Sequence, residues 1–279
     1  MALHSLRRQH TSRPLTVDEG ELPASVRVTQ LTQVFERGRP PVLDRIDLDV
    51  GPGEFVCLLG ASGCGKSTML SLIAGLDTPT SGHVEVTVGR PALMFQEPAL
   101  LPWLTAAGNV ELALRARGVG RTARRTEAQR LLALVNLAGQ GHKRVHELSG
   151  GMRQRVALAR ALAQDSRLLL MDEPFAALDA ITRDALHEEL ARLWSEQGLS
   201  IVFVTHNVRE AVRLGQRVVL LSSRPGRVAQ EYLIDIGQPR RIEDPEVADL
   251  AGRITDDLGR EIRRHAHAAT APLGTTVRA

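Results

Sequence analysis

Two patterns of hydrophobic positions alternate along this chain. Short stretches that are apolar, or that alternate between apolar and polar residues, are typical of strands. Longer stretches between them repeat apolar residues every three or four positions, as one face of a helix does. This alternation predicts an α/β fold, a largely parallel sheet with helices on its faces. We expect strands at Val26–Val34, Ile46–Val50, Glu54–Leu59, His83–Val88, Ala92–Phe95, Leu168–Asp172, Ser200–Thr205 and Arg217–Ser222.

Between Pro98 and Gln164 the pattern changes, because no strand-like run occurs there. Helical periodicity continues through this region, which predicts a helical insertion in the α/β core. We expect its helices at Ala107–Arg117, Thr122–Leu137 and Gly151–Leu162, and a later amphipathic helix near Pro245–His265. The expected organisation is a disordered tail (1–24), a main domain (25–240) with a core (25–97 and 163–240) and a helical subdomain (98–162), and a C-terminal helical extension with a frayed tail (241–279).

The composition is ordinary for a soluble globular protein: 279 residues, 43% hydrophobic and 24% charged. The longest apolar stretches are far shorter than the ~20 residues that a membrane-spanning helix needs. No apolar core segment occurs in the first 24 residues, so we expect no secretory signal. A net charge of +3 does not favour nucleic acid, and the basic run at 115–130 contains no aromatic residue. We therefore expect a solvated helix face there and no nucleic-acid partner.

A glycine-rich loop lies between an apolar strand run and a helical run. Its cation, Lys66, is one of only two lysines among 35 basic residues, which suggests that a compact ammonium is needed there. In such a loop, backbone N–H groups and a helix start converge on one anion. The sequence therefore predicts a nucleotide-phosphate site, with Lys66 on the β and γ phosphates and Ser67 on Mg²⁺. The loop consists of Gly60, Ala61, Ser62, Gly63, Cys64, Gly65, Lys66, Ser67 and Thr68.

Within this loop, Cys64 lies two residues before Lys66. A neighbouring cation lowers the pKa of a thiol in some proteins, which would make this cysteine reactive. We interpret Cys64 instead as a small loop residue.

Two adjacent carboxylates, Asp172 and Glu173, follow the apolar run Leu168–Met171. A buried strand that ends in two acids needs a partner for them, and Mg²⁺ is the expected partner. Asp172 would hold the metal, and Glu173 would polarise the water that attacks the γ phosphate. The alternative is that both acids only cap the segment that follows.

A second anion site is indicated by Ser149, Gly150 and Gly151, which precede a helix rich in arginine and alanine. A hydroxyl and two glycine amides thus meet the positive end of that helix. Because the chain has one nucleotide loop, this second site most simply serves a nucleotide held by another copy. With the loop and the acidic strand, the segment resembles the signature of the ATP-binding subunits of ABC transporters, usually LSGGQ, with Met152 in place of the glutamine.

The resemblance runs from Val26 to Val228 and implies a P-loop NTPase (RecA-like) core with an antiparallel β edge and an inserted helical subdomain. It implies that Gln96 senses Mg²⁺ and water and that His206 contacts the γ phosphate. It also implies that Asp179 contacts the opposing copy. Phe35 stands where an aromatic residue stacks on adenine in this family, although a core or strand-edge role remains an alternative.

One residue departs from the family pattern, and one loop matches the family's surface for a partner. Asn207 stands where the family commonly has aspartate, which puts a charge-based role in doubt. The loop residues Leu100, Leu101 and Trp103 form an apolar patch, which the resemblance assigns to contact with the membrane subunit. The alternative is that Trp103 packs under its own helical subdomain.

The segment Gln96–Trp103 resembles that of importers for nitrate, sulfonates and taurine, and the short interval from Gly82 to Gln96 is similar to that of the aliphatic sulfonate importers. This resemblance implies ATP hydrolysis with Mg²⁺ by two copies that sandwich two ATP molecules. It implies two integral membrane permease subunits and an external solute-binding protein as partners. It places the chain peripherally on the cytoplasmic face of the bacterial plasma (inner) membrane. The solute is predicted to be an aliphatic sulfonate, with taurine or nitrate as alternatives.

Two other classes of protein are alternatives to an importer subunit. A soluble ABC ATPase of DNA repair or translation usually carries paired cassettes or a coiled-coil insertion, and this sequence has neither. A non-hydrolysing nucleotide-dependent module would not need Glu173 and His206.

Overall fold

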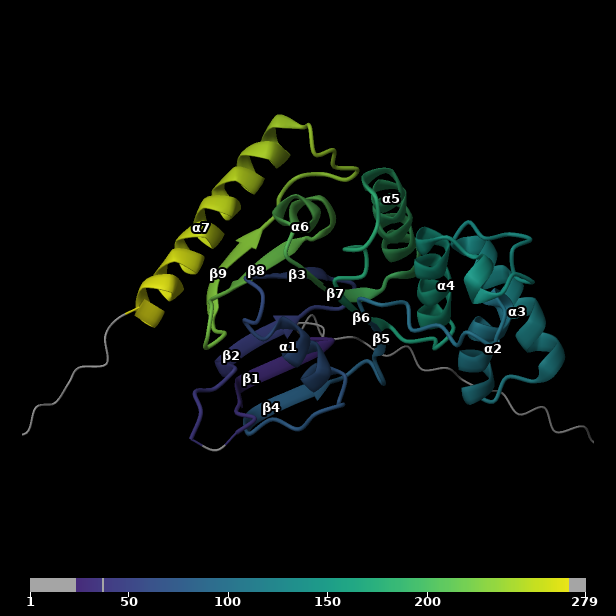
Figure 1. Ribbon diagram of the computed structural model, residues 1–279, viewed down its shortest axis with the longest axis horizontal. Coiled ribbons are helices and arrows are strands. Elements are labelled where there is room, and N and C mark those ends of the chain that lie inside the picture. Colours follow the sequence, from purple (N-terminus) through teal and green to yellow (C-terminus); the bar gives the residue numbers. More distant parts are fainter. Residues whose placement is uncertain (1–23, 37, 271–279) are drawn as a thin grey trace, which may run out of the picture.

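Two sheets form the centre of the molecule (Figure 1). The computed structural model describes residues 24–36 and 38–270, with side chains as far as residue 264. The larger sheet has the order β5-β6-β7-β3-β8-β9, in which only β9 is antiparallel to its neighbour. The smaller sheet, β2-β1-β4, is antiparallel. The strands are β1 Val26–Gln33, β2 Leu43–Val50, β3 Phe55–Leu59, β4 Ser81–Val86, β5 Ala92–Met94, β6 Leu168–Asp172, β7 Ser200–Thr205, β8 Arg217–Leu221 and β9 Val228–Leu233.

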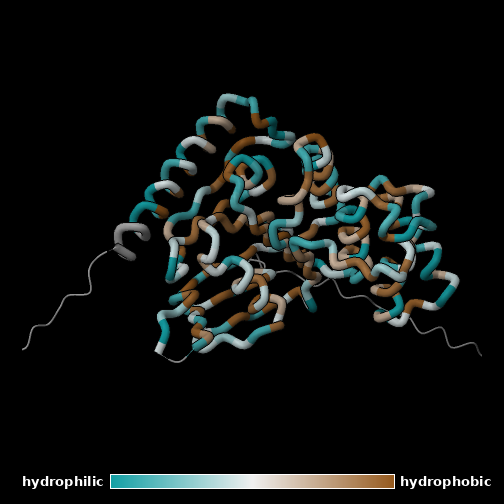
Figure 2. The backbone as a smooth tube through the Cα atoms, in the orientation of Figure 1, coloured by the Kyte–Doolittle hydropathy of each residue, from teal (hydrophilic) through white to brown (hydrophobic). Residues whose placement is uncertain are grey.

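The central strands are buried on both faces, as expected for a parallel sheet covered on two sides. In β7 every residue is buried: Ile201 and Phe203 face one hydrophobic cluster, and Val202 and Val204 face the other. Figure 2 shows hydrophobic residues along these strands and more hydrophilic ones on the outer helices. Because parallel strands end at the same edge, the segments that follow β3, β6 and β7 are brought together there.

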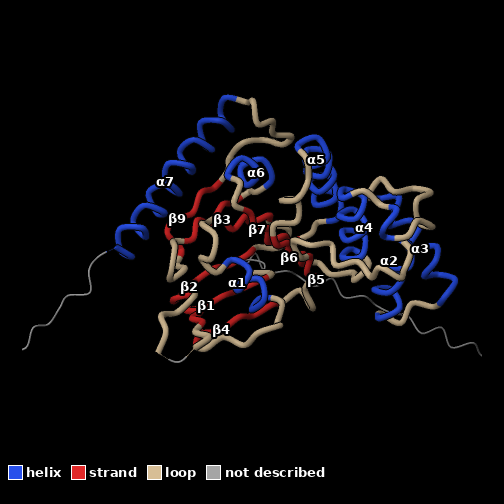
Figure 3. Tube along the Cα trace, in the orientation of Figure 1, coloured by secondary structure: helices blue, strands red, loops and turns tan. Residues whose placement is uncertain are grey.

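Helices cover both faces of the larger sheet (Figure 3). Helix α1 shares its hydrophobic cluster with both sheets, whereas α5 and α6 belong to the cluster on the other face. Helices α2, α3 and α4 pack on one another at one end of the molecule, and α7 packs on α6. No helix among the described residues combines the length and apolarity needed to cross a membrane. The helices are α1 Lys66–Ile73, α2 Ala106–Ala116, α3 Arg121–Leu134, the 3-10 turn η1 Val145–Glu147, α4 Gly150–Leu162, α5 Ala180–Gln197, α6 Val208–Leu214 and α7 Pro245–Thr270.

Most strand and helix predictions lie within a few residues of the structure, and β6 and β7 have the predicted bounds. The antiparallel β edge that the resemblance implied is a separate sheet of β1, β2 and β4, and the pattern-based prediction of a largely parallel sheet describes the larger sheet. Strand β9 was missed, since most of its side chains are exposed and its apolar and polar residues do not alternate. Helices α5 and α6 were not assigned. The predicted tail 1–24 lies outside the described residues except for Ala24, as do residues 271–279.

Candidate nucleotide-binding site

The glycine-rich loop is folded around its own lysine. Lys66 is the first residue of α1, and its Nζ donates to the carbonyl oxygens of Gly60 at 2.8 Å and Ala61 at 3.1 Å. Gly63 and Gly65 have φ angles of +77° and +102°, which side-chain-bearing residues rarely adopt. The loop is therefore a preformed cradle whose cation is only 6% exposed.

Packing beneath the loop explains its small residues. A Cβ on Gly65 would lie 2.5 Å from Cδ2 of Leu43, and one on Gly60 would lie 2.7 Å from Sγ of Cys64. Cys64 is buried, and this burial raises the pKa of its thiol more than the nearby charge of Lys66 lowers it. Cys64 is thus not the activated thiol that proximity to a cation alone suggests.

The two acids at the end of β6 have different surroundings. Burial raises the pKa of the Asp172 carboxyl, and a hydrogen bond from Ser67 opposes this rise. Glu173 has a φ of +43°, a strained value for a residue with a side chain, and its N–H donates to the carbonyl of Val204 at 3.0 Å. Its Oε2 lies 3.0 Å from Nδ1 of His206. Five other non-glycine residues also have a positive φ among the described residues, so it is this strain together with the contact to His206 that favours a chemical role for Glu173 over simple capping.

The residues at this edge suit a hard cation bound together with phosphate. No group of three or more His, Cys, Asp or Glu side chains is placed to hold a metal among the described residues. The carboxylate of Asp172 and the hydroxyl of Ser67 are brought together, and both offer oxygen ligands of the kind that Mg²⁺ takes alongside phosphate oxygens. The donor set and the glycine cradle therefore fit a magnesium nucleotide.

The Gln96 segment is joined to the acid pair through a residue that the sequence analysis missed. Gln96 follows β5 and is exposed, and its carbonyl accepts from Nε2 of Gln154 at 3.0 Å. The same nitrogen donates to the carbonyl of Pro174, directly after Glu173. Gln154 is 2% exposed on α4. A lone glutamine within an arginine-rich helix gives little indication of this role.

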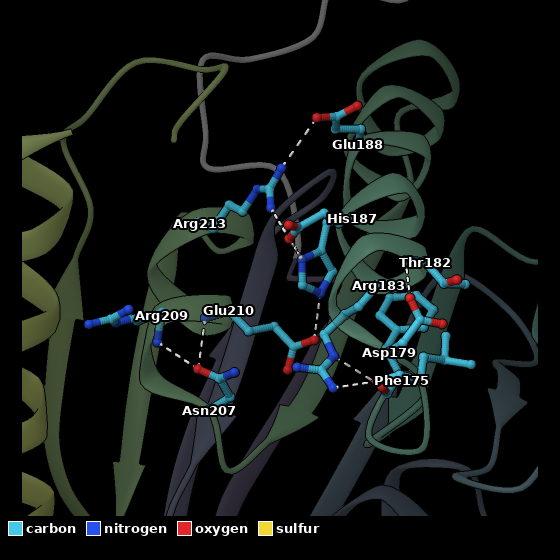
Figure 4. Close-up of polar contacts among 12 residues, drawn as sticks. Phe175, Asp179, Thr182, Arg183, His187, Glu188, Asn207, Arg209, Glu210 and Arg213 are labelled. Atoms are coloured by element: carbon cyan, nitrogen blue, oxygen red, sulfur yellow. Dashed lines mark hydrogen bonds and ion pairs between the residues drawn. The ribbon is translucent and has the colours of Figure 1, made fainter. Parts of the chain in front are cut away.

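His206 follows β7 directly and is exposed on 60% of its side-chain surface. The next residue, Asn207, is the N-cap of α6: its side chain accepts from the N–H groups of Arg209 at 3.0 Å and Glu210 at 3.4 Å (Figure 4). An asparagine serves this purpose as well as an aspartate does. The structural role of Asn207 therefore requires no charge.

The signature segment and the Asp179 segment lie close together. Ser149 is the N-cap of α4, and its hydroxyl accepts from the N–H of Met152 at 3.3 Å. Asp179 is the N-cap of α5, and hydrogen bonding from Thr182 lowers the pKa of its carboxyl. A Cβ on Gly151 would lie 2.4 Å from Cγ2 of Thr182. Ser149, Gly150 and Asp179 are exposed, and Figure 1 shows α4 well separated from α1. One chain thus does not bring the signature to its own phosphate loop.

Two aromatic residues singled out from the sequence are exposed. Phe35 has 61% of its surface accessible, so it is not part of the core. Trp103 is 67% exposed, which argues against the alternative that it packs under its own helical subdomain. Leu100, by contrast, is half-buried against the main hydrophobic cluster. The exposed part of the predicted apolar patch is therefore smaller than the sequence suggested.

Comparison with known proteins gives consistent matches. The sequence profile of the family described as ABC transporter matches residues 43–176. The taurine import ATP-binding protein TauB of Burkholderia pseudomallei is 45% identical, over 81% of this chain and 92% of the relative. The aliphatic sulfonates import ATP-binding protein SsuB 1 of Mesorhizobium japonicum is 47% identical, over 78% and 83%. The nitrate import ATP-binding protein NrtD of Synechocystis sp. is 46% identical, over 75% and 82%.

A solved structure extends the comparison to the fold. The ATP-binding cassette MJ0796, a dimer in a post-hydrolysis state bound to ADP and Pi, superposes with a TM-score of 0.68 at 33% identity. The match covers 76% of this chain and all of that one. The predicted P-loop NTPase core is thereby confirmed.

Proposed function

The chain belongs to the ABC transporter family, and on this premise we propose that it is the ATP-hydrolysing subunit of an importer. One observation carries the hydrolytic role: the strained Glu173, paired with His206, lies at the strand edge where the phosphate loop also begins. A module that only bound nucleotide would not need a carboxylate held in this way.

Each residue at this edge has a chemical task in the proposed reaction. The loop amides and Lys66 bind the phosphates, and Ser67, Asp172 and Gln96 would hold Mg²⁺. The metal ion, when bound, neutralises the charge that develops on the phosphates. Glu173 accepts the proton of the attacking water, and His206 orients the γ phosphate beside it. Phe35 offers a π face for the adenine base.

A second copy completes the site in this proposal. Ser149, Gly150 and Gly151 form an anion-binding helix end whose first two residues are exposed, and it lies apart from α1 of the same chain. Asp179 is exposed next to them. The dimeric state of the related cassette supports an arrangement in which each nucleotide is held by the loop of one copy and the signature of the other.

The proposed transported solute carries a sulfonate group. Taurine is itself an aminoalkane sulfonate, so two of the three importer types among the relatives act on this chemical group. An aliphatic sulfonate is our first choice, with taurine and then nitrate as alternatives. The partners are two permease subunits, contacted through the loop of the exposed Trp103, and indirectly a solute-binding protein. The chain would lie peripherally on the cytoplasmic face of the bacterial inner membrane.

Replacing the general base tests this proposal. Glu173→Gln keeps the shape of the side chain but cannot accept a proton, so phosphate release should fall at least ~100-fold. ATP binding should persist, and size-exclusion chromatography with ATP should show a trapped dimer. A variant with near-normal ATPase activity would contradict the assigned role.

Growth of a deletion strain on an alkanesulfonate as sole sulfur source tests the solute. Wild type should restore growth and Glu173→Gln should not. Restoration only on taurine as the sulfur source, or only on nitrate as sole nitrogen source, would select that alternative instead.

A further inference from the structure

A buried polar network lies directly behind His206 and connects three elements. Nε2 of His187 on α5 lies 2.6 Å from Oε1 of Glu210 on α6 (Figure 4). The Thr205 hydroxyl at the end of β7 donates to Oε2 of Glu210. His187 and Thr205 are each 2% exposed, and Glu210 is 7% exposed. No role in the reaction has so far been given to these three residues.

The hydrogen bonds of this network have a defined direction. The N–H of Asn207 donates to Oγ of Thr205 at 3.0 Å, so the single hydroxyl proton of Thr205 is directed to Glu210. The two oxygens of Glu210 thus accept from two different elements, β7 and α5. Buried carboxylates are stable only when they are satisfied in this way.

An ordinary helix cap would have a different hydrogen-bond pattern from that of Glu210. In a capping box, the acid at the third position of the helix accepts from the N–H of the N-cap residue. Glu210 occupies that third position after Asn207. The N–H of Asn207, however, donates to the Thr205 hydroxyl, and Glu210 accepts from that hydroxyl and from His187. The carboxylate therefore holds the two residues that flank His206, Thr205 directly and Asn207 through the Thr205 hydroxyl.

Packing does not hold the side chain of His206. It is 60% exposed, and a cavity of about 50 Å³ borders His206, Glu173, Thr205 and Glu210. Its one hydrogen bond among the described residues joins it to Glu173. The position of its ring thus depends mainly on the backbone between Thr205 and Asn207, which the network anchors.

We propose that Thr205, Glu210 and His187 are positioning residues that fix His206 against Glu173 for ATP hydrolysis. This inference rests on the proposed ATPase role of His206. The network acts on the orientation of a residue that contacts nucleotide, so its loss should lower kcat and leave the binding of ATP nearly unchanged.

The first test is the pair Thr205→Val and Thr205→Ser. Valine keeps the branched shape but removes the hydroxyl, so kcat should fall roughly tenfold, while KM for ATP changes less than about twofold. Serine keeps the hydroxyl and should restore kcat to within about twofold of wild type. Thermal unfolding of each variant separates lost folding from lost turnover. Wild-type kcat in folded Thr205→Val would overturn the proposal.

A double-mutant cycle separates this positioning role from a general structural one. In a His206→Ala background, Thr205→Val should lower the residual phosphate release by less than about twofold, because its target is already gone. An equal, roughly tenfold drop in both backgrounds would overturn the proposal. If Thr205→Val does not fold, the pair His187→Leu and His187→Gln is analysed in the same way, because leucine removes the donor and glutamine keeps one. Full activity of His206→Ala itself would instead overturn the proposed function.

Discussion

The phosphate-loop half and the signature half of the candidate site differ in how much of their packing and hydrogen bonding a single copy of the chain supplies. The phosphate-loop half is internally satisfied: Lys66 is buried and bonded to loop carbonyls, and Gly65 fits against Leu43 with no room for a Cβ. The signature half is open at its first two residues: Ser149 and Gly150 are exposed, and the nearest atom to a Cβ on Gly150 would be 3.8 Å away.

This difference separates residues that the fold requires from residues that only the reaction requires. The loop half is built into the packing between the sheets, so a change there should affect both folding and binding. The signature half is an exposed helix end, and its shape serves a surface outside the chain. Changes there should spare folding and still abolish turnover.

The largest expected effect comes from mixing two inactive variants. Lys66→Ala destroys the loop half. Ser149→Asp retains a good N-cap but places a negative charge where a phosphate would bind. Each alone should release almost no phosphate. In an equal mixture half of the dimers are mixed, and each contains one intact composite site, so about a quarter of wild-type activity should return.

A matched control uses two lesions in the same half. Lys66→Ala mixed with Glu173→Gln leaves both sites of every dimer defective, so activity should stay absent. Recovery in this control, or none in the first mixture, would show that the signature does not act across a dimer.

The contrast between the two halves also explains which structural features could be predicted from the sequence. The phosphate loop, the acid pair and the bounds of β6 and β7 are local patterns, and they were predicted from consecutive residues. The Glu210 network was not predicted, because its members are separated by up to 23 residues and meet only when α5 packs beside α6. The strain at Glu173 and the link made by Gln154 likewise arise from tertiary packing. The edge strand β9 lacks a buried face that would make its pattern visible.

A smaller effect is expected from adding one methyl group to each half. Gly65→Ala combines a φ of +102° with a clash against Leu43, so it should lower the free energy of unfolding by about 2–4 kcal/mol and weaken ATP binding. Gly150→Ala meets only an ordinary contact, with Cδ2 of Leu178 at 3.8 Å, in a helical first turn, so its free energy of unfolding should stay within about 0.5 kcal/mol of wild type. Urea titrations measure both values. Equal losses of stability would contradict the contrast.

The smallest predicted effect comes from neutralising one carboxylate in each half, Asp172 in the loop half and Asp179 in the signature half. Measured without nucleotide or Mg²⁺, the two changes should shift the melting temperature in opposite directions. Burial raises the pKa of Asp172, so its ionised form costs stability once the pH exceeds the ordinary carboxyl value of about 4. Asp172→Asn should therefore raise the melting temperature at pH 7 by roughly 1–3 °C, a gain that shrinks as the pH falls toward 4.

Hydrogen bonding from Thr182 lowers the pKa of Asp179, so its ionised form stabilises the chain above the ordinary value and loses this effect as the pH falls through the lowered pKa. Asp179→Asn should therefore lower the melting temperature slightly at pH 7, because asparagine keeps the cap but not the charge. Opposite signs of the two melting-temperature shifts would mean that the carboxylate of the loop half destabilises the free chain until its ligand binds. The carboxylate of the signature half, by contrast, stabilises the chain without a ligand. Shifts of the same sign for the two variants would contradict that division.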